Sequence, residues 1–95
     1  MMMPTPKVPE GEAYDTRIRR LRMRSWRRGI KEMDIILGTY SETHLTDLSP
    51  KLLDLYDSLL SENDQELYAW VTGQETAPES YAPLMDLITA HAHDM

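Results

Sequence analysis

The sequence contains no cysteine, which excludes a disulfide framework, a thiolate metal site and a thiol nucleophile. The absence of cysteine also fits a reducing compartment. No window approaches the roughly 18 consecutive apolar residues of a membrane span, so we expect no membrane insertion. The start of the chain lacks the charged and apolar regions of a secretory signal. These absences favour a bacterial-type cytoplasmic protein, with an arginine-rich mitochondrial presequence as the alternative.

Recognisable catalytic and cofactor motifs are missing as well. The chain has no glycine-rich phosphate loop, no Gly-x-Ser-x-Gly turn around a nucleophile and no HExxH zinc motif. His91 and His93 lie two positions apart, on different helix faces, and we expect both to be exposed. His44 falls in a polar connection without a paired carboxylate. We therefore expect no enzyme, no metal site and no tightly bound cofactor.

The size and composition indicate one small helical domain. The chain has 95 residues with 41% hydrophobic content. Residues 1–13 are rich in proline and poor in large apolar groups, so we expect a disordered amino-terminal tail followed by a domain over residues 14–92. No run alternates Val, Ile and Thr with polar residues, so we expect no sheet. The predicted fold is all-α, a compact bundle of five short helices.

Apolar spacing and glycine positions place the first two helices. Apolar residues at i, i+4 and i+7 begin at Tyr14 and predict the first helix, and this pattern weakens near Ser25. We expect Gly29 to be the N-cap of the second helix, with Glu32 at the third helical position folding back onto the Gly29 backbone N–H. Gly38 is predicted to mark a weakening or bend near the end of this helix.

Local signals also place the last three helices. Ser49 and Pro50 supply a cap residue and a first-turn proline for the third. The fourth is expected to begin at Asn63 and to end at Gly73. The fifth is expected to start near Ser80, with one apolar face made of Leu84, Leu87, Ile88 and His91.

The charge of the chain changes sign near residue 32. Residues 17–32 carry a net charge of +7, whereas residues 33–95 carry −11. One interpretation is that the arginines pair with the acidic second half of the same molecule. The other is that they form an interaction surface for an acidic partner or an anion, and Trp26 within the cluster favours this reading. We expect a solvated acidic face made of Asp54, Asp57, Glu62, Asp64 and Glu66.

The segment from Trp26 to Asp34, with Arg28, Gly29 and Glu32 at its centre, resembles the RGxxE signature of the SdhE family of FAD assembly factors. This family is the bacterial counterpart of the mitochondrial succinate dehydrogenase assembly factors. A second segment, with Leu59-Leu60, Asp64, Leu67-Tyr68, Trp70 and Gly73, also resembles the family. The likeness covers roughly residues 15 to 90.

The resemblance implies a small five-helix chaperone for the flavoprotein subunit of succinate dehydrogenase or fumarate reductase. The factor promotes covalent attachment of FAD to a histidine of that client, so FAD belongs to the client. The partner-binding residues implied by the signature and its flanks are Trp26, Arg27, Arg28, Gly29, Glu32 and Asp34. The alternatives are a general protein-interaction module or toxin-antitoxin regulator, and a direct flavin carrier. Nucleic-acid binding ranks last because the whole chain is acidic.

Overall fold

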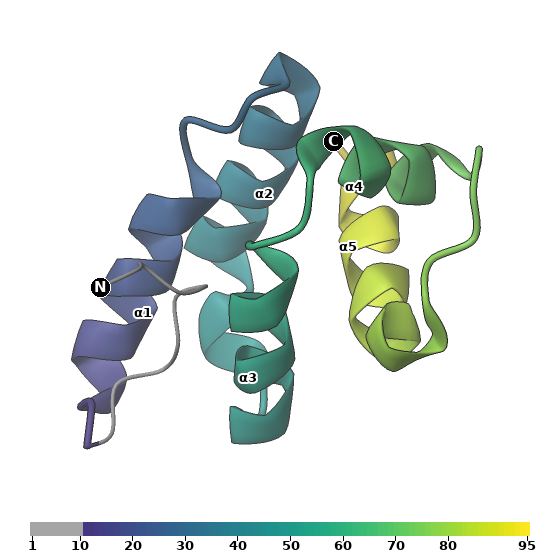
Figure 1. The fold of residues 1–95 in the computed structure, drawn as a ribbon. Helices are drawn as coiled ribbons and strands as arrows, with labels where there is room; N and C mark the ends of the chain where they lie inside the picture. The colour runs from purple at the N-terminus through teal and green to yellow at the C-terminus, as the bar shows by residue number, and fades with distance from the viewer. Residues whose placement is uncertain (1–10) are drawn as a thin grey trace, which may run out of the picture.

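Seven helical segments follow one another along residues 11–95, the part of the chain that this computed structural model describes. Their order is α1 (Tyr14–Ser25), α2 (Lys31–Thr43), the 3-10 helix η1 (Leu45–Asp47), α3 (Pro50–Leu59), α4 (Asp64–Thr72), the 3-10 helix η2 (Glu79–Tyr81) and α5 (Ala82–His93). These residues contain no strand, and the prediction of an all-α bundle with five helices is confirmed (Figure 1). Residues 1–10 of the predicted tail lie outside the described residues.

Helices α3 and α4 begin where local signals predict them. The Ser49 hydroxyl accepts a hydrogen bond from the Leu52 backbone N–H at 3.2 Å, with Pro50 at the first helical position. The Asn63 side chain accepts one from the Gln65 N–H at 2.8 Å. Gly73 ends α4 in a left-handed conformation with φ of 82°, which a residue without a side chain adopts at little cost.

One expectation for α2 is wrong. Its N-cap is Ile30 rather than Gly29, so Glu32 occupies the second helical position and makes no capping box. The helix continues through Gly38 to Thr43. Gly38 is buried under the indole ring of Trp26, and a Cβ at this position would overlap that ring. The glycine therefore allows close packing between the end of α1 and the side of α2.

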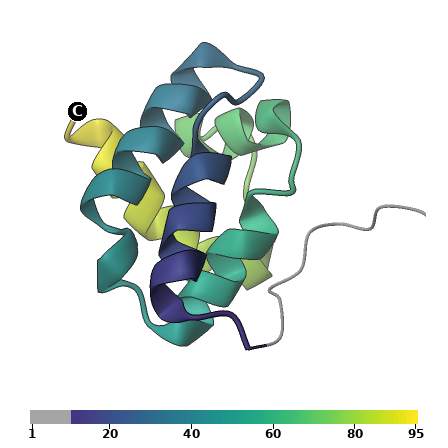
Figure 2. The ribbon, with the colours of Figure 1, turned by 90° about the vertical axis from the view of Figure 1, so that its left-hand side faces the viewer.

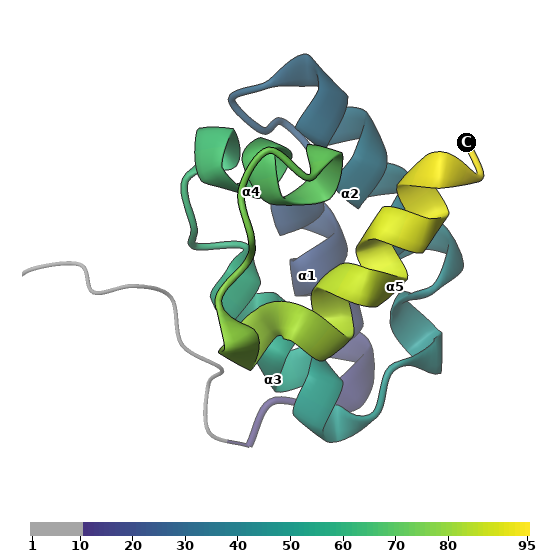
Figure 3. The same cartoon turned by 90° about the vertical axis from the view of Figure 1, so that its right-hand side faces the viewer.

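One core joins all the helices. Its largest fully buried members are Tyr56, Leu21, Met33, Leu37, Leu45, Leu53, Leu59, Leu67, Leu84 and Ile88. Helix α5 crosses α2 and α3 diagonally (Figure 3) and buries Leu84 and Ile88. Leu87, predicted on the same face, is 44% exposed at the edge of this contact. At the carboxyl end of α1, the buried Ser25 hydroxyl bonds the Tyr56 hydroxyl at 2.6 Å, which fixes the point where the next loop begins.

Candidate functional site

Four arginines of the basic segment form ion pairs with three aspartates of α3 and α4. Because the arginines recur every three or four residues, they follow one side of α1 and the loop after it. The pairs are Arg17 with Asp54, Arg20 and Arg24 with Asp57 at 2.6 and 2.5 Å, and Arg28 with Asp64 at 2.7 Å. Asp57 is only 3% exposed, so the expected solvated face is wrong for this residue and for Asp64. The intramolecular interpretation of the arginine cluster holds for these four.

Arg20 also binds the chain segment that precedes α1. Its Nε donates to a Glu12 carboxylate oxygen at 2.9 Å. Hydrogen bonds to Asp57 and then to Glu12 raise the pKa of Arg20 above its ordinary value, so the guanidinium stays charged. Glu12, which the sequence placed in the tail, is thus anchored to the bundle.

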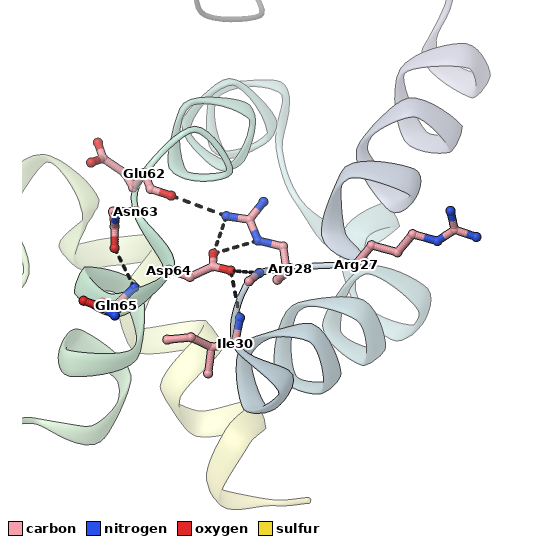
Figure 4. Close-up of a pocket in the computed structure, with 8 residues that line it drawn as sticks. Arg27, Arg28, Ile30, Glu62, Asn63, Asp64 and Gln65 are labelled. Atoms are coloured by element: carbon pink, nitrogen blue, oxygen red, sulfur yellow. Dashed lines mark hydrogen bonds and ion pairs between the residues drawn. The ribbon is translucent and has the colours of Figure 1, made fainter.

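The RGxxE segment forms the loop between α1 and α2, and Asp64 of α4 holds it in place (Figure 4). One Asp64 oxygen accepts from Arg28 Nε at 2.9 Å, and the other accepts from the backbone N–H groups of Gly29 and Ile30. Arg28 also donates to the carbonyl of Leu60 at 3.0 Å. Both side chains of the Arg28–Asp64 pair are 12% exposed. We call this arrangement the Arg28–Asp64 lock.

A second carboxylate fixes the same loop from the other side. One Asp34 oxygen accepts hydrogen bonds from the backbone N–H groups of Arg27 and Arg28. Arg27 has a φ of 63°, a left-handed conformation that is uncommon for a residue with a Cβ. The Asp34 contact stabilises this turn, which directs the Arg27 side chain away from Asp64 (Figure 4).

The locked loop leaves three of the predicted site residues exposed: Arg27, Gly29 and Glu32. Beside it is an open hollow of about 490 Å³ lined by residues of the loop and of the α3–α4 junction. A Cβ at Gly29 would lie 3.3 Å from the Asp64 carboxylate, so a larger residue presses on the lock. Among residues 11–95 the Glu32 carboxylate has no hydrogen-bond partner. It lies in the first turn of α2, where the helix dipole favours a negative charge.

Trp26 lies between the loop and the outer side of α2. Its ring packs on Gly38, and its Nε1 donates to a Glu42 carboxylate oxygen at 3.1 Å. The side chain is half-buried, so its other parts reach solvent. Trp26 is thus held rigidly at the edge of the predicted site.

His91, predicted to be exposed, is half-buried instead. It bonds the Thr39 hydroxyl at 2.8 Å and packs edge-on against His44 at 5.3 Å between ring centroids. Burial and the nearby His44 lower the pKa of His91 below its ordinary value of 6.5. Residues 11–95 hold no group of three or more His, Asp or Glu side chains arranged to bind a metal ion. In the same residues, no helix has the length and apolar character to cross a membrane.

Comparison with known proteins relates the chain to one family. Residues 19–92 match the family Sdh5, described as "flavinator of succinate dehydrogenase". The chain belongs to this family. The match includes the entire RGxxE loop, the Arg28–Asp64 lock and helices α2 to α4. The predicted membership in the family of FAD assembly factors is therefore confirmed.

Similar proteins are named as succinate dehydrogenase assembly factors. Succinate dehydrogenase assembly factor 2-B of Drosophila mojavensis is 34% identical, over 94% of this chain and 60% of the relative. Succinate dehydrogenase assembly factor 2 of Aspergillus terreus is 37% identical, over 88% of this chain and 28% of the relative. That of Meyerozyma guilliermondii is 44% identical, over 65% and 46%. The chain thus spans less than two thirds of the length of these curated relatives.

The names of all three relatives describe them as mitochondrial, so they lend no support to the predicted bacterial-type cytoplasmic location, which stays a prediction.

The structure divides the predicted site residues into two groups. Arg28, Asp34 and Trp26 use their polar groups within the molecule, whereas Arg27, Gly29 and Glu32 face solvent. Partner binding by any of the six stays a prediction. Sequence analysis missed the part that Asp64 plays, because it treated this aspartate as one of a solvated series. The segment that resembles the family did include Asp64, and that match was the available signal.

Proposed function

We propose that this protein is an assembly factor that binds the flavoprotein subunit of succinate dehydrogenase, or of fumarate reductase, and promotes its covalent flavinylation with FAD. The observation that carries the proposal is the family match over residues 19–92, which includes a rigidly held and exposed RGxxE loop. The word "flavinator" in the family description supports flavinylation, and the relatives' names support a role in succinate dehydrogenase assembly.

The geometry of the loop supports binding to a folded protein. Asp64 and Asp34 hold its backbone in one conformation, so docking does not have to order it and the entropic cost of association is reduced. Gly29 presents an exposed backbone without a side chain, which lets a partner's chain approach closely. Glu32 offers an accessible carboxylate for donors on the partner. Arg28 and Asp34 act indirectly, by maintaining the shape of the loop.

We propose that the factor works as a chaperone and is not itself the catalyst. The client flavoprotein holds FAD and supplies the histidine that becomes attached to it. Docking of the rigid loop stabilises the client conformation in which flavin and histidine are aligned, and alignment of reacting groups lowers the entropic part of the barrier. The factor itself binds no FAD tightly under this mechanism.

Covalent flavin fluorescence of the denatured flavoprotein subunit tests this function. The subunit is produced without the factor, with the wild type, with Glu32→Ala and with Asp15→Ala. Asp15 is a matched control because it is also an exposed acid at the second position of a helix, α1. Each substitution removes one favourable interaction with a helix dipole, worth about 0.3 to 1 kcal/mol of stability.

The proposal predicts a rise in covalent flavin with the wild type and with Asp15→Ala, and at least a severalfold smaller rise with Glu32→Ala. Thermal unfolding of both variants verifies that they are equally folded. Equal fluorescence with and without the wild-type factor would remove the flavinylation function and leave a general interaction module. Equal support by Glu32→Ala and Asp15→Ala would remove Glu32 from the working surface only.

A further inference from the structure

The arginines of α1 that make no ion pair share a different face of the helix. From residue 16 to residue 31 the chain has no acidic residue. Arg17, Arg20, Arg24 and Arg28 turn toward α3 and α4, where their carboxylate partners lie. The other cations of this segment, Arg19, Arg22, Arg27 and Lys31, have no carboxylate partner among residues 11–95. Arg22 is half-buried and donates from its Nε to the Ser41 carbonyl at 3.1 Å, whereas Arg19, Arg27 and Lys31 are exposed.

Two of the exposed cations flank an exposed apolar residue in the sequence. Met23 is 72% exposed, and Arg19 and Arg27 lie four residues before and after it. Positions four apart share a helix face, so Arg19 and Met23 are neighbours on the surface of α1. Figure 2 shows α1 at the front of the molecule, with none of the other described helices lying across its outer side. We call the surface made by Arg19, Met23 and Arg27 the basic stripe.

The composition of the basic stripe is typical of a protein interface. Arginine and methionine are enriched where proteins meet, whereas most surface charges elsewhere are lysine, glutamate and aspartate. Methionine is flexible and adapts its shape to a partner surface. The stripe ends at Arg27, which begins the RGxxE loop, and Trp26 lies beside it on Gly38. The stripe and the loop therefore form one continuous surface.

We propose that the basic stripe is a second docking surface for the flavoprotein client and that it receives an acidic segment carrying an apolar side chain. This inference rests on the proposed function. The other five arginines of the segment already make contacts within the molecule, so the positive charge of the stripe remains available on a molecule whose net charge is −6. Opposite charge on the client speeds its approach and sets the orientation in which the RGxxE loop meets it. Met23 then contacts the apolar side chain at the centre of the stripe.

Binding of the purified full-length protein to the purified flavoprotein subunit, measured at 50 and 300 mM NaCl, tests this. The stripe variant combines Arg19→Glu with Arg27→Glu. The control is Lys51→Glu with the stripe residues unchanged, which reverses the charge of an exposed residue on α3. A second pair, Met23→Ser and Met23→Leu, separates the apolar contact from the charge. All four are surface changes, and unfolding measurements verify that they leave the fold intact.

The stripe proposal predicts a Kd at least tenfold weaker at 50 mM NaCl for the Arg19→Glu/Arg27→Glu variant and less than threefold weaker for Lys51→Glu. At 300 mM NaCl the Kd values of the wild type and the stripe variant should lie closer together, because salt screens the long-range attraction between the charges. Met23→Ser should weaken binding severalfold, whereas Met23→Leu should not.

Normal client binding and flavinylation by the stripe variant would overturn the stripe proposal while leaving the proposed function in place. Absence of any wild-type binding to the flavoprotein, with no gain in covalent flavin, would overturn the proposed function and the stripe proposal with it. Tighter binding of the stripe to a single-stranded RNA than to the flavoprotein, with the same sensitivity to charge reversal, would assign the surface to nucleic acid instead.

Discussion

The Arg28–Asp64 lock leads to the most direct prediction about the site, tested by Asp64→Ala. This substitution removes the acceptor for Arg28 Nε and for the backbone N–H groups of Gly29 and Ile30. Removing one partner of a buried ion pair costs about 3 to 5 kcal/mol. Both side chains here retain 12% exposure beside an open hollow, so water offsets part of the loss. We expect the free energy of unfolding to fall by about 2 to 3 kcal/mol.

Two further variants separate charge from hydrogen bonding at the same position. Asp64→Asn keeps an oxygen that accepts from the Gly29 N–H but removes the negative charge, so we expect a loss of about 1 to 2 kcal/mol. The double variant Arg28→Ala/Asp64→Ala should lose less free energy of unfolding than the sum of the two single losses, with a coupling energy of about 1 to 3 kcal/mol. Asp86→Ala, an exposed change on α5, serves as the control and should stay within about 0.5 kcal/mol.

Urea unfolding measures these differences, and amide hydrogen exchange locates them. The Gly29 N–H should exchange slowly in the wild type and quickly in Asp64→Ala, because its acceptor is gone. Asp64→Ala should also support less flavinylation at temperatures where it stays folded, since the loop loses its fixed shape. A loss of stability below about 0.5 kcal/mol together with rapid Gly29 exchange in the wild type would refute the lock.

Two other predictions concern packing and pH. Gly38→Ala should destabilise the wild type by up to about 2 kcal/mol because the added Cβ overlaps the Trp26 ring. In a Trp26→Ala background the same change should stabilise the protein by about 1 kcal/mol, because alanine has the higher helix propensity. Urea unfolding of the four proteins checks this, and an effect of the same sign in both backgrounds would contradict the packing. His91 has a pKa below 6.5 in the folded protein, so the unfolded chain binds its proton more tightly and stability should fall as pH drops below about 6.5. Unfolding curves between pH 7.5 and pH 5 should show a smaller fall in His91→Gln, whereas His93→Gln, at an exposed position, should behave as the wild type.

Local sequence signals were sufficient where a helix end depends on its own neighbours. Ser49, Asn63 and Gly73 cap or terminate helices through contacts within three residues, so the sequence alone placed the ends of α3 and α4. Gly29 shows where this reasoning stops. Its backbone N–H is satisfied by Asp64, 35 residues away, and α2 begins one residue later than the local capping rule predicts.

Gly38 and His91 show the same limit for side chains. A glycine within a helix reads as a weak point in the sequence, but in the fold it makes room for the ring of Trp26. A histidine near the carboxyl end reads as exposed, but α5 brings it against Thr39 and His44. Both outcomes depend on which helices pack together, and periodicity does not specify that.

The sequence by itself determined the helical class, most helix positions and the family of this protein, because spacing, caps and the RGxxE pattern are local properties of the chain. Only the tertiary structure decided the use of the arginines. Those at positions 17, 20, 24 and 28 meet aspartates of α3 and α4, and Arg22 donates to the Ser41 carbonyl of α2, while those at 19 and 27 remain exposed. An ion pair requires two groups within about 4 Å of each other, and for residues more than 30 positions apart that distance is set by helix packing.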